Sequence, residues 1–171
     1  MAHSNRAMGG RSNGGYPEAL GARVGFLLAR AHLIAREKAD RALAGVGLTM
    51  KGYAALATLM SDGPVSQQRL SQRIRMDPAT MVDVIDTLEL SGHIQRRRNP
   101  EDRREYGLHT TPKGRALFAR AQKVIEIAEA EALQGLAPDE AKVLIELLAR
   151  IADPRSGSPM TDELITGAMG R

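Results

Sequence analysis

The stretch from 66 to 110 reads SQQRLSQRIRMDPATMVDVIDTLELSGHIQRRRNPEDRREYGLHT, and it decides the expected fold. Its first half predicts two short helices, over 67–74 and 78–90, because Ser66 and Asp77 are residue types that cap helices well. The second helix starts with proline, which is tolerated at a first helical position, and a glycine follows its end. Two capped helices separated by so short a break have the spacing of a helix-turn-helix.

The second half of the stretch predicts a β-hairpin. Residues 93–98 and 103–110 have the composition of strands, and Asn99-Pro100-Glu101-Asp102 between them has the composition of a turn. A hairpin that follows a helix-turn-helix is a wing. Thr111 and Pro112 then begin the next helix, with threonine as the cap and proline as the first helical residue.

Longer helices are predicted on both sides of this unit. Residues 18–44 place apolar side chains at helical spacing with arginines on the other side, which is typical of one long amphipathic helix. A threonine-capped helix is expected over 50–60. Apolar residues recur at helical spacing after Pro112 and again after Pro138, where Ala137 is a poor cap. The expected fold class is therefore mainly α, a winged helix-turn-helix with a small β-hairpin wing.

The chain of 171 residues is long enough for one domain with tails. We expect residues 1–16 to be a disordered arm, 17–152 to be the domain, and 153–171 to be a mostly loose tail. No apolar run approaches the ~18 residues that a membrane helix needs, and the N-terminal segment lacks the apolar core of a secretory signal. We therefore expect a cytoplasmic protein without a membrane partner.

Composition excludes several classes of site. The sequence has no cysteine, which removes disulfides, thiol nucleophiles and Cys-ligated metals. The four histidines are scattered rather than spaced as metal ligands, and no catalytic constellation is present. We expect no enzyme activity, no metal and no cofactor. The net charge of +4 fits an anionic partner, whereas an aromatic content of 3% argues against base stacking.

Arginine is concentrated in two segments. Residues 65–76 contain three arginines and no acid, and residues 96–104 contain five arginines against two acids. Strand alternation places the arginines of the first hairpin strand on two faces, so that one set faces the body of the protein. A protruding hairpin arginine can enter a DNA minor groove, where the phosphate potential is concentrated.

The helix over 78–90 is acidic instead. Residues 77–92 contain four acids and no lysine or arginine. We expect Asp86 and Glu89 to pair with arginines elsewhere in the fold. Asp83 lies on the face that would meet DNA, where it can accept a hydrogen bond from a cytosine amino group or repel phosphates. Base reading is therefore expected from the N-terminal part of this helix, and affinity from the arginines beside it.

The order of elements and several local strings resemble the MarR family of bacterial transcriptional regulators, over about residues 18–151. The strongest match is GHIQRRRNPEDRR at 92–104, followed by Thr111-Pro112-Lys113-Gly114, which fits the family's wing signature. Weaker matches are Leu48-Thr49, Gln68-x-Leu70-Ser71 and Leu88-Glu89-x-x-Gly92.

The resemblance implies a cytoplasmic, nucleoid-associated homodimer that binds a pseudo-palindromic operator in double-stranded DNA. Residues 17–48 and 112–152 would supply the dimerisation helices, and 49–111 the winged helix-turn-helix lobe. The resemblance also implies a small-molecule effector, such as an aromatic or amphipathic acid, that changes DNA binding. A ligand-relieved repressor is the function expected on this basis.

Site residues are expected from the charge pattern and from the resemblance together. Those expected to contact DNA are Ser66, Gln67, Arg69, Arg73, Arg75, Pro78, Ala79, Thr80, Asp83, Arg97, Arg98, Arg103 and Arg104. By position in the family's motif, Asp102 and Arg96 brace the wing, and Arg104 lies at the minor groove, with Arg103 as a second candidate. The chain departs from the family at Asp83 and Thr87, where arginine is frequent, and its lack of cysteine excludes the family's peroxide-sensing mechanism.

The family's effector cleft lies between the dimerisation helices and the DNA-binding lobe, and His32, Arg36 and Tyr53 are the residues expected to line it. The competing interpretation makes His32 an interface or core histidine and Tyr53 a core residue. Two other functions stay open at this point. One is a dimeric ligand- or partner-binding module without specific DNA binding, which the acidic helix favours. The other is a non-specific architectural DNA binder.

Overall fold

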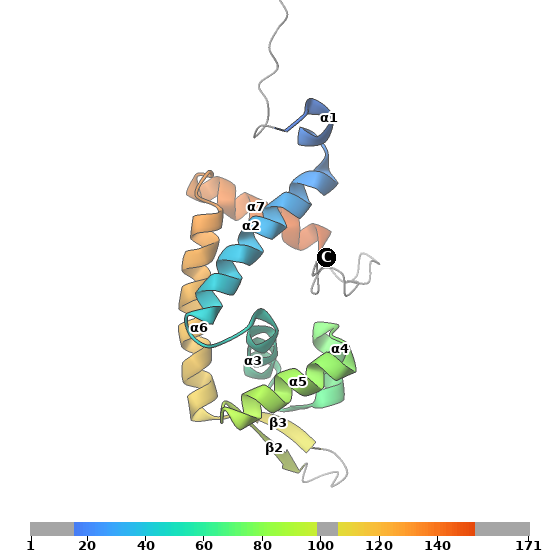
Figure 1. The fold of residues 1–171 in the computed structure, drawn as a ribbon, viewed down its shortest axis with the longest axis vertical. Helices are drawn as coiled ribbons and strands as arrows, with labels where there is room; N and C mark the ends of the chain where they lie inside the picture. Colours follow the sequence, from blue (N-terminus) through green and yellow to red (C-terminus); the bar gives the residue numbers. More distant parts are fainter. Residues whose placement is uncertain (1–15, 99–105, 153–171) are drawn as a thin grey trace, which may run out of the picture. The chain divides into compact units, whose positions relative to one another are not determined.

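The computed structural model describes residues 16–98 and 106–152 (Figure 1). It divides after Glu37 into two compact units. The first unit contains helix α1 (Glu18–Gly21) and the beginning of helix α2 (Val24–Ala44). The second unit contains the end of α2 and all later elements: α3 (Met50–Asp62), β1 (Val65–Ser66), α4 (Gln67–Ile74), α5 (Pro78–Leu90), β2 (Ile94–Arg98), β3 (Tyr106–Thr110), α6 (Pro112–Ala132) and α7 (Pro138–Ile151). The expected fold class, mainly α with a small antiparallel sheet, is confirmed.

The first unit corrects one expectation. The single helix expected over 18–44 is interrupted between Gly21 and Val24, because glycine is a poor helix former and the chain turns there. The Arg23 N–H bonds back to the Leu20 carbonyl, and the Arg23 carbonyl then accepts from Leu27 at the start of α2. Within this unit the ring of Tyr16 packs edge-on against Phe26 at 4.9 Å, which ties the segment before α1 to α2.

Helix starts in the second unit are where the sequence predicts them. The side chains of Thr49, Ser66, Asp77 and Thr111 each accept a hydrogen bond from the backbone N–H three residues later. Helix α7 begins without a side-chain cap at Ala137, and the Glu140 carboxylate instead accepts from the Ala137 N–H at 2.8 Å. Expected and observed boundaries therefore agree closely, although α3 continues two residues further, to Asp62.

The sheet contains one strand more than the expected hairpin. Strand β3 lies between β2 and a short strand β1, and both pairs are antiparallel. Leu108 of β3 pairs on one side with Val65 of β1, which is buried, and on the other side with Arg96 of β2. A strand of two residues has no periodicity to detect, which is why the sequence did not indicate β1. It attaches the hairpin to the beginning of α4.

One hydrophobic core holds this second unit together. Its largest fully buried side chains come from α2, α3, α4, α5 and both hairpin strands, and they are Leu43, Leu56, Leu70, Met81, Ile85, Ile94 and Leu108. The helical residues follow the 3.6-residue period and the strand residues point to one face of the sheet. The core therefore fixes the orientation of α5 relative to the hairpin.

The junction between the hairpin and α6 explains the Thr-x-x-Gly motif. The Thr111 hydroxyl donates to the Gly92 carbonyl at 2.7 Å and accepts from the Gly114 N–H at 3.0 Å. The Thr111 N–H donates to the His93 carbonyl at 3.0 Å. A Cβ atom on Gly114 would overlap that same His93 carbonyl oxygen, so only glycine allows α6 to approach β2 this closely.

We expect Gly114→Ala to lower the free energy of unfolding by about 2–3 kcal/mol, because the added methyl group forces the backbone of α6 away from His93. Urea denaturation at fixed protein concentration measures the change. Gly135→Ala is the matched control, since a Cβ atom there meets nothing within 4 Å. Equal stability of the two variants would contradict the close-approach explanation.

Candidate nucleic-acid interface

Helices α4 and α5 form a rigid helix-turn-helix. Arg75, between them, has left-handed backbone angles of φ 57° and ψ 43°, the only non-glycine residue with positive φ in the part of the chain that the structure describes. The Ser71 hydroxyl donates to the Met76 carbonyl, and the Met76 N–H donates to the Ser71 carbonyl at 3.0 Å. These bonds close the turn and fix the angle at which α5 leaves it.

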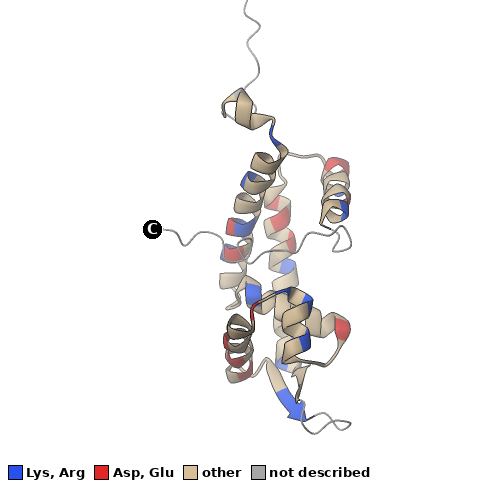
Figure 2. Cartoon of the chain, turned by 90° about the vertical axis from the view of Figure 1, so that its right-hand side faces the viewer, with Lys and Arg blue, Asp and Glu red and all other residues tan. Residues whose placement is uncertain are grey.

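The arginines of α4 and its C-terminal turn are exposed. Arg69, Arg73 and Arg75 all lie at the surface, and the Arg73 Nε atom pairs with Asp62 at 3.1 Å. Figure 2 shows basic segments, in blue, on helix α4 and on the hairpin strand β2. The expected segregation of positive charge therefore persists in three dimensions, around the acidic helix α5.

The acidity of α5 has a structural explanation for three of its four acids. Asp77 caps the helix at 2.8 Å from the Thr80 N–H, and its pKa is lowered by hydrogen bonds from the side chain and backbone of Thr80. Asp86 and Glu89 face strand β2 and both bind Arg96, the arginine pairing that the sequence predicts for them. Only Asp83 projects to solvent without such a role.

Arg96 is the centre of a half-buried polar cluster. Its Nη2 atom lies 2.7 Å from Asp86 Oδ1 and 3.3 Å from Gln67 Oε1, and its Nη1 atom binds Glu89. The Arg96 backbone N–H also donates to Glu89 at 2.9 Å. Burial alone would lower the pKa of Arg96, but the hydrogen bonds that it donates to Asp86 and Glu89 raise it, so the guanidinium is permanently charged. The cluster joins β2, α5 and the start of α4.

The next two arginines of β2 point outward. Arg97 and Arg98 are exposed, and Arg98 Nε donates to the Tyr106 hydroxyl at 3.4 Å across the hairpin. Sequence reasoning missed Tyr106, although the hairpin register pairs it directly with Arg98. Arg103, Arg104 and Asp102, for which wing roles are expected, lie outside the described residues. The described part of the hairpin therefore supplies one inward and two outward arginines.

The outward face of α5 contains three of the residues expected there and one that was missed. Pro78, Ala79 and Asp83 are exposed, while Thr80 is half-buried because its side chain turns back to Asp77. Val82 is 41% exposed and shares this side of the helix. No role is predicted for Val82 from the sequence, and its exposure in the structure places it on the outward side of the helix. Ser66 and Gln67 are half-buried, as cap of α4 and partner of Arg96 respectively.

The three candidate effector residues fall in different units. Tyr53 of α3 is half-buried and stacks on Phe118 of α6, with ring centroids 5.7 Å apart. Burial raises the pKa of Tyr53, and the charges of Glu129 and Glu126 on α6 raise it further. His32 is exposed and Arg36 is half-buried, both on the part of α2 that belongs to the first unit. The three candidates therefore belong to two different units, Tyr53 to the second and the other two to the first.

Two absences concern only the residues that the structure describes. None of their helices is both long enough and apolar enough to span a bilayer. They also contain no group of three or more metal-ligating side chains that could hold an ion.

Comparisons with known proteins agree with this architecture. The family model described as the MarR family matches residues 48–106, which run from the start of α3 to the hairpin. A putative transcriptional regulatory protein for the hcr operon of Thauera aromatica is 31% identical, over 80% of this chain and 82% of that protein.

Two solved structures have the same fold. The transcriptional repressor CouR bound to a 23-mer DNA duplex is 32% identical, with a TM-score of 0.72 over 79% of this chain and 96% of that one. CouR from Rhodococcus jostii RHA1 bound to p-coumaroyl-CoA is 27% identical, with a TM-score of 0.68 over 81% of this chain and 97% of that one. With a relative above 30% identity covered over most of its length, the chain belongs to the MarR family of transcriptional regulators.

Proposed function

We propose that this regulator is a homodimeric repressor that binds a specific, pseudo-palindromic sequence in double-stranded DNA. The observation that carries the proposal is the ion-pair cluster at Arg96, whose guanidinium binds both Asp86 and Glu89 on α5 and offsets half of their negative charge. Without it, the acids of α5 would repel the phosphates on either side of a major groove. With it, α5 presents Ala79, Val82 and Asp83 to the bases, and arginines lie on the elements beside it.

The exposed arginines suit contacts with the DNA backbone. Arg69 and Arg73 lie on α4, Arg75 lies in the turn before α5, and Arg97 and Arg98 lie on the hairpin strand β2. Such contacts position a protein on DNA without reading its sequence, while the residues on α5 read base edges. Arg103 and Arg104 at the hairpin turn would extend the contact into a minor groove, with Asp102 and Arg96 bracing the wing.

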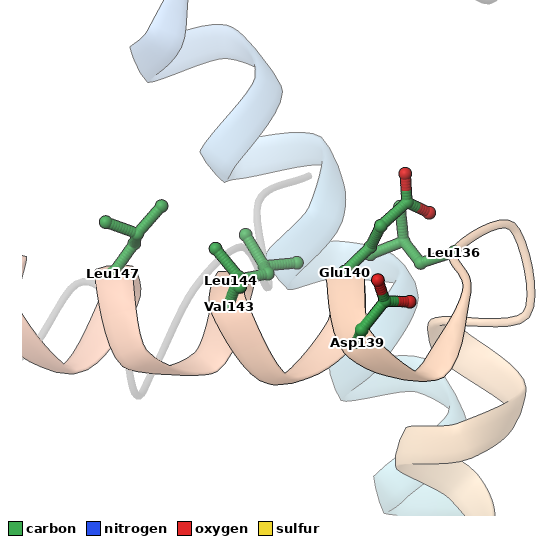
Figure 3. Close-up of a pocket in the computed structure, with 6 residues that line it drawn as sticks. All are labelled: Leu136, Asp139, Glu140, Val143, Leu144 and Leu147. Carbon is green, nitrogen blue, oxygen red and sulfur yellow. The ribbon is translucent and has the colours of Figure 1, made fainter.

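Helix α7 supports the proposed dimer. None of its residues is buried, and its exposed apolar side chains include Val143, Leu147 and Ile151. Figure 3 shows the groove that Leu136, Leu144 and Leu147 line on one side of the helix, with a volume of about 390 Å³. We propose that residues 17–48 and 112–152 form the dimerisation region and 49–111 the DNA-binding lobe. A second copy of the chain would cover the apolar side of α7.

We propose further that a small molecule controls DNA binding, as the p-coumaroyl-CoA complex of CouR suggests. The effector is an aromatic or amphipathic acid, and Tyr53, His32 and Arg36 are its candidate contacts. The protein acts by binding and catalyses no reaction. Its place of action is the cytoplasm, at the bacterial nucleoid, because its proposed partner is chromosomal DNA.

The first test measures DNA affinity across a salt series. The purified full chain should bind a selected duplex at least 1,000-fold more tightly than random duplex, and the logarithm of its affinity should fall steeply with the logarithm of salt concentration. A steep salt dependence without sequence preference would identify an architectural DNA binder instead. A flat response would favour a module that does not bind DNA.

The second test concerns the cluster at Arg96. We expect Arg96→Met to weaken DNA binding at least tenfold, because two carboxylates on α5 then face the phosphates unneutralised. Adding Asp86→Asn and Glu89→Gln to Arg96→Met should restore most of the affinity. Fluorescence anisotropy with the selected duplex measures both effects, and circular dichroism controls for folding. If the combined variant binds no better than Arg96→Met alone, charge neutralisation is not the function of the cluster.

The third test concerns the dimer. We expect Val143→Glu combined with Leu147→Glu to produce a folded monomer that has lost specific DNA binding, because two charges cannot be buried in an apolar interface. Sedimentation velocity measures the mass, and Glu146→Gln on the same helix is the control. A variant that stays dimeric would exclude α7 from the interface.

A further inference from the structure

The outward face of α5 has an unusual chemical composition, which bears on the sequence it can read. Its exposed side chains, within a helix that the structure describes completely, are Pro78, Ala79, Val82, Asp83, Thr87 and Leu90. Leu90 is 90% exposed at the end of the helix. The face therefore combines apolar surface with a single carboxylate.

No side chain on this face offers a hydrogen-bond donor to DNA. The Thr87 hydroxyl donates to the Asp83 carbonyl at 2.8 Å, and Ser91 beyond the helix donates to the Thr87 carbonyl at 2.7 Å. The Thr80 side chain is engaged with Asp77. Asp86 beside this face accepts from Arg96 and likewise has no proton to donate.

The edges of the bases determine what such a face can recognise. Guanine presents two acceptors in the major groove, N7 and O6, and needs a donor such as arginine. The usual bidentate reading of adenine needs an amide, which can donate to N7. Cytosine presents the N4 amino group, which a carboxylate accepts, and thymine presents a methyl group, which an apolar side chain contacts. A face without donors is therefore suited to pyrimidine edges.

Asp83 is placed to accept from cytosine. Its side chain is exposed, and it has no hydrogen bond or ion pair with the described residues. It follows Ala79 by one helical turn and lies next to Val82, so a carboxylate and two apolar side chains project together from the first two turns. A residue in this part of a recognition helix reaches base edges directly.

We infer that α5 reads pyrimidines, with Asp83 accepting from a cytosine amino group and Ala79 and Val82 contacting thymine methyl groups. The inference rests on the proposed function, since it names the bases that the proposed repressor selects. Asp83 is then the residue that rejects guanine at its position, because its carboxylate would face the acceptor atoms N7 and O6 of guanine. Affinity comes from the arginines of α4 and the hairpin.

Selection of bound sequences from a randomised duplex tests the role of Asp83. The wild-type full chain should favour cytosine by about tenfold at one position of each half-site. Asp83→Ala should abolish that preference and bind random duplex more tightly. Asp83→Asn should shift the preference to adenine, because an amide both donates to N7 and accepts from the N6 amino group. Glu146→Gln on α7 makes the same charge change without touching α5 or the groove beside Leu144 and Leu147, and it should leave every preference unchanged.

Replacing thymine with deoxyuridine tests the apolar contacts. Each replacement removes one methyl group, and at the contacted position it should weaken wild-type binding about three- to fivefold. Val82→Ala should reduce that loss to less than twofold. Replacement of thymines outside the half-sites is the control, and because Val82 lies at the surface its truncation leaves the core intact.

The outcomes separate the inference from the proposed function. A wild-type chain that enriches no sequence overturns both. If the wild-type chain enriches a sequence, and Asp83→Ala and Asp83→Asn both keep all of its base preferences, base reading by Asp83 is overturned. The proposed function is not affected by that result. Equal sensitivity of wild type and Val82→Ala to deoxyuridine at each thymine overturns the methyl contact of Val82.

Discussion

The proposed DNA-binding surface depends on one half-buried cluster, in which Arg96 binds Asp86 and Glu89 and reaches Gln67. Removing charges from water has a cost that offsets much of their attraction, so the cluster adds little to net stability. Its contribution is positional and electrostatic. It fixes β2 against α5 and the start of α4, and it offsets one of the two negative charges that Asp86 and Glu89 bring to the helix.

A second constraint connects the hairpin to the long helix α6. The missing Cβ of Gly114 lets α6 approach the carbonyl of His93, and Thr111 bonds to the carbonyls of both Gly92 and His93. The end of α5, the start of β2 and the start of α6 therefore form one junction with little freedom to deform. If α6 takes part in the dimer, a change in the angle between subunits is transmitted to α5 and the hairpin as a rigid-body movement.

Much of this arrangement follows from local sequence signals. Caps such as Thr49, Ser66 and Asp77 act on their own helix within three residues, so they locate helix starts without knowledge of the fold. The exposure of Val82 on the outward side of α5 was harder to predict, because valine is apolar like the core residues of the same helix. Its exposure depends on which elements pack beside it. Strand β1 and the pairing of Tyr106 with Arg98 depend on long-range register, which no local pattern contains. The break at Gly21 was missed because the apolar spacing continues across it.

The chemistry of α5 suggests that α5 provides sequence specificity, whereas α4 and the hairpin provide affinity. A carboxylate on a recognition helix weakens binding to any DNA. The loss of binding free energy is greatest where no base amino group donates a hydrogen bond to the carboxylate. Arginines on α4 and the hairpin can supply enough attraction to overcome this cost at every sequence, but they cannot distinguish one sequence from another. Asp83 then contributes to specificity mainly by penalising wrong bases, since binding free energy is lost at each site where its carboxylate remains unpaired. Discrimination and affinity can thus be changed independently, by substitutions on different secondary-structure elements.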